Sequence, residues 1–135
     1  MWLANSQATS LLLQRLNNPS VIWPSVYPGM DVIANRITPE HCDLGGALSF
    51  YDHLVSFGQG HDAQFLLHEF DAKFAYQSGT SVLFPGKVLN HSVPQWSGGE
   101  RMVIAHYAKD DVQDRLELRR PLLPTQLGWW SIFHK

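Results

Sequence analysis

The chain has 135 residues and is poor in features that would assign it to a specialised class of protein. It contains one cysteine, which excludes an internal disulfide and fits a reducing compartment. Charged residues make up 16% of the chain and the net charge is −2, so whole-chain charge does not support nucleic acid as a partner. The apolar run at residues 11–13 is too short for a signal peptide or a membrane span, and no basic segment precedes it. We therefore expect an intracellular protein, cytoplasmic or nuclear, that has no membrane partner.

The residues that are abundant favour a compact, β-rich protein. Hydrophobic residues make up 44% of the chain, and ten glycines with eight prolines indicate many turns. The length suits one domain, which we place at residues 1–135 with a core at about 30–110 and a C-terminal extension at 111–135.

One short helix is expected near the N-terminus, at residues 6–17. Ser6 can cap its first turn, and Leu12 and Leu16 lie four residues apart on one face. Pro19 follows the segment closely, so the helix should end before it.

The rest of the chain alternates between extended segments and turn-forming residues. The expected strands are residues 31–38, 49–58, 63–70, 72–79, 80–86, 87–96 and 101–109. Residues 21–29 fit an edge strand or an extended loop, and 49–58 also tolerates a helix. Short strands at this regular spacing predict an antiparallel sandwich or barrel.

The first chemical motif is a histidine and an aspartate separated by one residue, His41-Cys42-Asp43. On an extended backbone both side chains point to the same side, with Cys42 directed away, because strand side chains alternate. A second histidine from a distant strand, such as His91, would complete a face of two histidines and one carboxylate. Such a face leaves three coordination positions of an octahedral Fe(II) open, as an oxygen-activating iron requires.

Each piece of this pattern has an ordinary explanation when it stands alone. Seven histidines and twelve acidic residues make a chance pairing of this kind common, and His91 alone would suit a hydrogen-bonded sheet histidine. Arg101 adds weight because it follows His91 by ten residues, across a Gly98-Gly99 turn. We therefore expect His91 and Arg101 on adjacent antiparallel strands. The planar fork of an arginine suits the distal carboxylate of a 2-oxo diacid held by the metal.

The combined pattern resembles a known family. HCD at residues 41–43, followed by SGTSVLFPGKVLNHSVPQWSGGERMVIAHYAKDDV at 78–112, is similar to the core of the Fe(II)/2-oxoglutarate-dependent dioxygenase superfamily. The resemblance spans about residues 32–107 and implies a double-stranded β-helix (jelly-roll) core. It also implies that His41, Asp43 and His91 ligate Fe(II) and that Arg101 binds the distal carboxylate of the co-substrate 2-oxoglutarate.

A narrower resemblance concerns the segments VIANRITPEHCD, YDHLVSFG and IAHYAKDDV. They are similar to fungal members of the superfamily, some related to the ten-eleven-translocation and J-binding-protein nucleic-acid oxygenases. This resemblance implies hydroxylation of a C–H bond, with a methylated nucleobase as the suggested substrate. A protein side chain or a small metabolite stays open as the substrate.

Two other interpretations remain open. A cupin shares the β-helix, but its first motif usually holds two histidines and a glutamate, whereas this chain has HCD. A catalytically inactive or truncated remnant would keep the β-helix as a binding module. Only forty residues precede His41, fewer than the superfamily usually has, so we expect a truncated N-terminus. A partner chain or a missing N-terminal segment would then cover the exposed sheet.

The remaining conspicuous residues have weaker functional cases. Surface or structural roles are the simpler interpretation for four further histidines, His53, His61, His68 and His106, and for the basic residues Arg115, Arg119 and Arg120. Contact with substrate or co-substrate and structural hydrogen bonding are both open for Asn35 and Arg36. The apolar residues expected to line the pocket or the core are Val82, Phe84, Val103 and Ala105.

Overall fold

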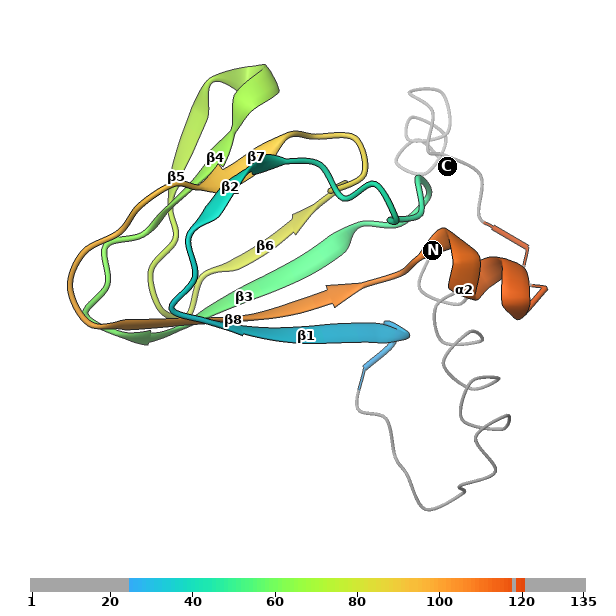
Figure 1. Cartoon of the computed structure of the whole chain (residues 1–135), viewed down its shortest axis with the longest axis horizontal. Helices are drawn as coiled ribbons and strands as arrows, with labels where there is room; N and C mark the ends of the chain where they lie inside the picture. The colour runs from blue at the N-terminus through green and yellow to red at the C-terminus, as the bar shows by residue number, and fades with distance from the viewer. Residues whose placement is uncertain (1–24, 118, 121–135) are drawn as a thin grey trace, which may run out of the picture.

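The computed structural model describes residues 25–117, 119 and 120 (Figure 1). The helix predicted at residues 6–17 and the part of the C-terminal extension beyond residue 120 lie outside the described residues. No helix in the described part of the chain is long and apolar enough to cross a membrane.

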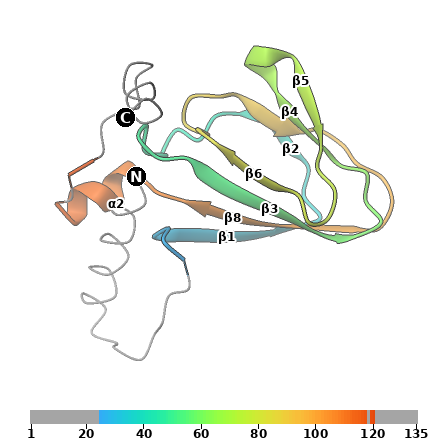
Figure 2. The same ribbon diagram turned by 180° about the vertical axis from the view of Figure 1, so that it is seen from behind.

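Two four-stranded antiparallel sheets face each other (Figures 1 and 2). The first sheet has the order β1 (Gly29–Ala34), β8 (Glu100–Tyr107), β3 (Asp52–Gln59), β6 (Ser81–Phe84). The second sheet has the order β2 (Thr38–His41), β7 (His91–Val93), β4 (Gln64–Leu67), β5 (Ala72–Ala75). Two short helical segments complete the described chain, η1 (His68–Phe70) and α2 (Asp110–Arg115). The mainly β, jelly-roll-like fold predicted from the sequence is confirmed.

The first two strands of the domain pair with its last two strands. β1 pairs with β8 and β2 pairs with β7, so strands from the two halves of the chain alternate within both sheets. Within β8 the inward residues Arg101, Val103 and Ala105 are buried, whereas Met102 is 42% exposed. This alternation confirms the predicted inward direction of Arg101, Val103 and Ala105.

The core fills the space between the sheets. Its largest members are Phe65 and Tyr76, each 1% exposed, with Phe84 beside them. The ring of Phe65 meets Tyr76 and Phe84 edge to face, with centroids 5.5 and 5.1 Å apart. Such aromatic pairs add about 0.5–1.5 kcal/mol each beyond the burial of their surface.

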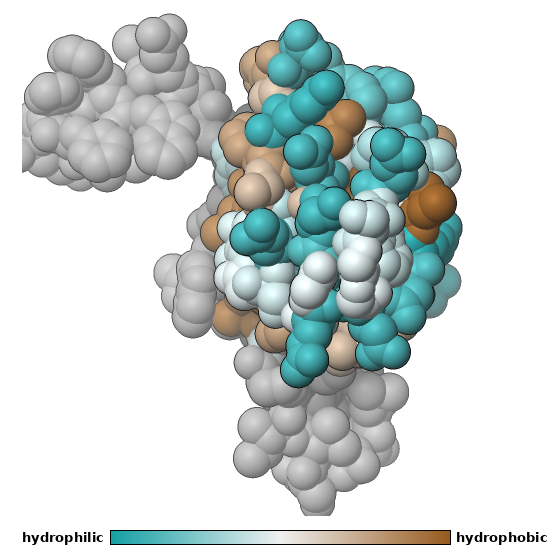
Figure 3. Space-filling view, turned by 90° about the vertical axis from the view of Figure 1, so that its left-hand side faces the viewer, coloured by the Kyte–Doolittle hydropathy of each residue, from teal (hydrophilic) through white to brown (hydrophobic). Residues whose placement is uncertain are grey.

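The outer face of the first sheet is apolar. Val32 on β1, Leu83 on β6 and Met102 on β8 are 64%, 63% and 42% exposed. At the end of the molecule where turns connect the two sheets, the surface is mostly hydrophilic (Figure 3). That a further segment or a partner chain covers the apolar sheet face stays a prediction.

Several predicted strands are shorter than expected. Residues 49–58 contain strand β3 and no helix, but residues 63–70 divide into β4 and η1. Only His91–Val93 of residues 87–96 form a strand. Residues 25–28 form no strand before β1 begins.

Candidate metal centre and carboxylate pocket

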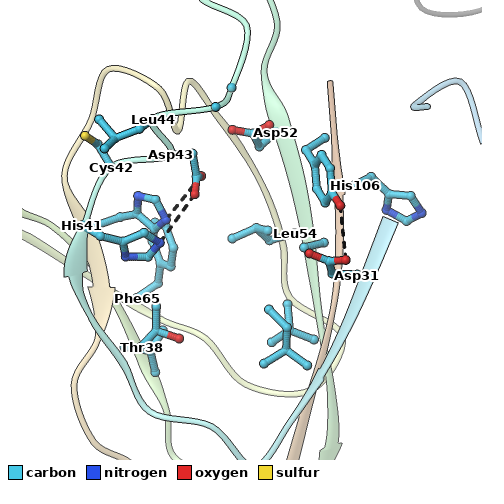
Figure 4. Close-up of a pocket in the computed structure, with 18 of the residues that line it drawn as sticks. Asp31, Thr38, His41, Cys42, Asp43, Leu44, Asp52, Leu54, Phe65 and His106 are labelled. Atoms are coloured by element: carbon cyan, nitrogen blue, oxygen red, sulfur yellow. Dashed lines mark hydrogen bonds and ion pairs between the residues drawn. The ribbon is translucent and has the colours of Figure 1, made fainter. Parts of the chain in front are cut away.

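The structure brings His41, Asp43 and His91 together. Figure 4 shows the side chains of His41 and Asp43 pointing toward each other in the pocket. His41 is the last residue of β2 and lies directly opposite His91, the first residue of β7. Nε2 of His41 lies 3.5 Å from Oδ1 of Asp43, and Nε2 of His91 lies 3.8 Å from its Oδ2. One ligand atom from each residue lies within 4.8 Å of the other two, a spacing that can hold a metal ion.

Backbone carbonyls orient both imidazole rings. Nδ1 of His41 lies 2.9 Å from the Pro39 carbonyl, and Nδ1 of His91 lies 3.0 Å from the Leu89 carbonyl. If Nδ1 carries the proton and donates it to the carbonyl, Nε2 keeps its lone pair for a metal. Burial lowers the pKa of His91, which favours the neutral imidazole that metal binding requires.

A contact with Gly86, rather than strand alternation, positions Asp43. The residue lies beyond the end of β2, and its N–H donates to the Gly86 carbonyl at 2.9 Å. A Cβ at Gly86 would lie only 2.5 Å from Oδ2 of Asp43 and 2.4 Å from Oδ2 of Asp52. Cys42 and Asp43 thus follow β2 rather than belong to it, and the side chains of His41 and Asp43 still converge, as the motif predicts.

Asp52 is a buried carboxyl near Asp43 that sequence reasoning did not identify. It begins β3, is 6% exposed and lines the same pocket as Asp43. Burial, and next the charge of Asp43, raise the pKa of Asp52 to about 7. No local pattern marks this residue, because it approaches Asp43 only through the packing around Gly86.

Arg101 lies across the sandwich from the histidines, so the prediction of adjacent strands is wrong. It belongs to β8 of the first sheet, whereas His91 belongs to β7 of the second sheet. Residues 94–99 cross between the sheets instead of forming a hairpin. Gly98 and Gly99 have φ of +70° and +38°, and a Cβ at Gly99 would collide with the carbonyl of Gln59.

The guanidinium of Arg101 is buried without a carboxylate partner. The side chain is 3% exposed, and its Nη1 donates to the Arg36 carbonyl at 3.0 Å. Its backbone N–H donates to Oδ1 of Asn35 at 2.9 Å, so Asn35 and Arg36 both serve the structure around it. Within the described part of the chain no acidic side chain forms an ion pair with Arg101, and its buried Nε has no hydrogen-bond partner.

The histidine–aspartate cluster and Arg101 line one pocket of about 420 Å³. His41, Asp43 and His91 lie on one side and Arg101 on the other. The apolar side chains along this pocket include Leu54, Val93, Val103 and Ala105. Two of the expected wall residues, Val82 and Phe84, do not line it; the ring of Phe84 packs against the His91 ring at 4.6 Å.

The other described histidines have contacts outside the candidate metal cluster, although His106 also lines the pocket. Nε2 of His53 lies 2.8 Å from the Ser81 hydroxyl, and Nε2 of His68 lies 2.8 Å from the Ser92 hydroxyl. His106 stacks on His53, with ring centroids 5.6 Å apart.

One basic residue of the described C-terminal segment forms two ion pairs. Arg120 binds Asp110 and Asp114 at 2.8 and 2.6 Å. These ion pairs fit the surface or structural role expected for Arg120.

Comparisons with known proteins extend the fold assignment. No family model and no curated protein match the sequence. Among solved structures, the chain is similar to NgTET1 in complex with 5mC DNA at 19% identity and a TM-score of 0.57. That match covers 95% of this chain and 54% of NgTET1, so the chain spans about half the length of that structure. A cupin 2 conserved barrel domain protein from Salinispora arenicola CNS-205 is similar at 15% identity and a TM-score of 0.43, over 73% of this chain and 78% of that one. The likeness to NgTET1 shows a shared fold, the double-stranded β-helix.

Proposed function

We propose that this protein is an Fe(II)- and 2-oxoglutarate-dependent oxygenase that hydroxylates a C–H bond of its substrate. One observation carries the proposal. A cluster of two histidines and an aspartate faces the same pocket as a buried arginine that has no acidic partner in the described residues. These are the two groups that a metal-chelating 2-oxo diacid needs at its opposite ends.

The ligand set suits Fe(II). Two imidazole nitrogens and one carboxylate, with the remaining positions open, are the donors typical of non-haem iron oxygenases. Iron with 2-oxoglutarate would supply the oxidation of an unactivated C–H bond by O₂. His41, Asp43 and His91 would hold the metal, and the Pro39 and Leu89 carbonyls would keep both rings in position.

The environment of Arg101 suits the distal carboxylate of 2-oxoglutarate. A buried guanidinium without an anion is costly, and a bidentate carboxylate would remove much of that cost. Val103 and Ala105, on the same strand, would keep water away from the chain of the co-substrate. The charge-assisted hydrogen bonds then form in a low dielectric, where they are stronger.

The first substrate to test is 5-methylcytosine in DNA. NgTET1, whose fold this chain shares, was solved with 5mC DNA. Asp31, Tyr107 and Lys109 also line the pocket, and the Lys109 ammonium lies 5.1 Å from the Tyr107 ring centroid. An aromatic ring beside hydrogen-bonding groups suits a base displaced from its helix. The expected result is 2-oxoglutarate consumption that depends on the methylated oligonucleotide and falls as salt increases. Equal consumption with the unmethylated oligonucleotide would exclude this substrate.

Anaerobic titration with Fe(II) and 2-oxoglutarate tests the proposed activity at its binding step. The wild-type protein should develop the weak visible charge-transfer band of a 2-oxo acid chelated to Fe(II). His91→Ala should abolish the band, whereas His53→Ala, which changes a histidine bonded to Ser81 outside the pocket, should retain it. Absence of the band from the wild type, or its persistence in His91→Ala, would reject the metal site.

A further inference from the structure

The second sheet carries three contacting side chains on the face away from the pocket. Nε2 of His68, the first residue of η1, lies 2.8 Å from the Ser92 hydroxyl. Nδ1 of the same ring lies 3.4 Å from Oε2 of Glu40. Because a carboxylate only accepts hydrogen bonds, this arrangement favours the proton on Nδ1 and leaves Nε2 to accept from the serine. One imidazole thus joins side chains of β2 and β7.

The order of these three groups matches a catalytic triad, but the burial of Ser92 excludes attack on a substrate. The serine is 2% exposed, whereas a nucleophile must reach the atom that it attacks. The three side chains are therefore better suited to holding strands together than to chemistry of their own.

Two of the three side chains are sequence neighbours of the histidines in the candidate metal cluster. Glu40 precedes His41, and Ser92 follows His91. Because side chains alternate along a strand, Glu40 and Ser92 face away from the pocket, and neither lines it. His41 and His91 lie directly opposite each other, with ring centroids 4.3 Å apart. A contact that fixes Glu40 and Ser92 therefore also fixes the backbone from which both histidines project.

Strand β2 has few other attachments at this end. It is a four-residue edge strand, and its pairing with β7 is irregular between Thr38 and His41. Pro39 within it has no N–H to donate to β7. The ion pair of Glu40 with His68 reaches past β7 to the residue that follows β4. This ion pair attaches β2 to a second part of the sheet.

The segment that carries His68 also holds the residues on both sides of His91. The N–H of His68 donates to the Asn90 carbonyl at 3.0 Å, and the N–H of Asn90 donates to Oε1 of Glu69 at 2.9 Å. The contact with Ser92 lies on the other side of His91. The start of η1 therefore fixes the backbone of this histidine from both directions.

We propose that His68 is a positioning residue for the metal, because its ring holds β2 against β7 at the spacing at which His41 and His91 bind one ion. This inference rests on the proposed function. His68 itself does not line the pocket, so it acts on the metal only through the two strands.

The test compares His68→Ala with His53→Ala by anaerobic calorimetric titration with Fe(II) alone. The variants are matched, because each imidazole lies 2.8 Å from a serine hydroxyl, but His53 contacts Ser81 in the other sheet. His68→Ala should bind Fe(II) about tenfold more weakly than the wild type, as is typical after loss of a group that supports a metal ligand. His53→Ala should bind Fe(II) as the wild type does, and equal affinities of the two variants would overturn the inference.

Thermal unfolding of the metal-free variants separates positioning from general stability. Each variant loses one contact with a serine, and the partly exposed ion pair with Glu40 adds little to stability. The two thermal midpoints should therefore fall by similar amounts. A much larger fall in His68→Ala would show that His68 supports the whole fold, and it would overturn the inference.

Glu40→Ala provides a second variant, in which the altered side chain is 55% exposed and folding should be retained. It should weaken Fe(II) binding about threefold in the wild type. It should cause no further loss in His68→Ala, because both residues act through one contact. Unchanged affinity in Glu40→Ala, or additive losses in the double variant, would overturn the inference. A wild type that binds no Fe(II) would reject the proposed function itself, which separates the two failures.

Discussion

The two ends of the pocket are built in different ways. At the end that we propose binds metal, His41, Asp43 and His91 lie close together, and backbone carbonyls hold both imidazoles. At the other end, Arg101 is held by packing and by the Arg36 carbonyl, and its buried Nε has no partner in the described residues. The side chains of the proposed metal end are thus already in place in the ligand-free structure, whereas the proposed carboxylate end would be completed by its ligand. Loss of a side chain should therefore reduce metal affinity at the first end and ligand-induced stabilisation at the second.

The largest expected effect is at the metal end. His91→Ala removes one of three ligands, so Fe(II) affinity should fall on the order of a thousandfold, beyond the 10–100-fold typical of losing a supporting group. Metal titration by calorimetry under anaerobic conditions measures it. His53→Ala is the matched control, and comparable losses in both variants would contradict the assignment.

The carboxyl of Asp52 should control the pH dependence of the metal-free protein. Its pKa is raised from 3.8 to about 7, so the folded state takes up a proton more readily than the unfolded state does. The resulting stabilisation is complete below about pH 4 and is lost as the pH rises towards 7. Asp52→Asn should not lose stability in this way as the pH rises. At pH 8 it should be more stable than the wild type by roughly 3 kcal/mol. Urea denaturation across this pH range measures the difference, and parallel pH profiles would contradict it.

Arg101 should control stabilisation by the co-substrate. At about 100 times its Kd, 2-oxoglutarate should stabilise the Fe(II)-loaded wild type by about 2.7 kcal/mol. Arg101→Met should show no stabilisation at the same concentration, yet bind Fe(II) normally. Thermal unfolding with and without 2-oxoglutarate measures the stabilisation of the wild type and of Arg101→Met. Equal loss of Fe(II) binding would instead make Arg101 a structural residue.

The smallest expected effect is a difference in Fe(II) affinity between alanine substitutions at two glycines near the proposed metal end. A methyl group at Gly86 meets the carboxylates of Asp43 and Asp52, so Gly86→Ala should displace Asp43 and weaken Fe(II) binding about tenfold. A methyl group at Gly45 has no atom within 4 Å, which makes Gly45→Ala the control. Equal affinities in the two variants would show that the position of Asp43 does not depend on Gly86.

The sequence predicted the site residues better than their arrangement. Residue types and order identified His41, Asp43, His91 and Arg101, and the structure places all four around one pocket. The strand relation between His91 and Arg101 was wrong because a Gly-Gly turn has the same local signature whether it closes a hairpin or connects two sheets.

The roles of Asp52 and His68 were beyond sequence reasoning for a different reason. Asp52 matters because Gly86 lets it approach Asp43. His68 would position the metal ligands because its ring contacts side chains on β2 and β7. Both properties arise from contacts between distant strands. In the same way, alternation predicted the inward face of β8, but the pairing of β8 with β1 required the folded chain.

The proposed function requires that the two ends of the pocket bind one ligand together. Calorimetric titration of 2-oxoglutarate under anaerobic conditions, with and without Fe(II), measures this, and glutarate serves as a ligand that lacks the 2-oxo acid. Fe(II) should strengthen 2-oxoglutarate binding at least tenfold and leave glutarate binding nearly unchanged. Equal 2-oxoglutarate affinity with and without Fe(II) would contradict the proposed function.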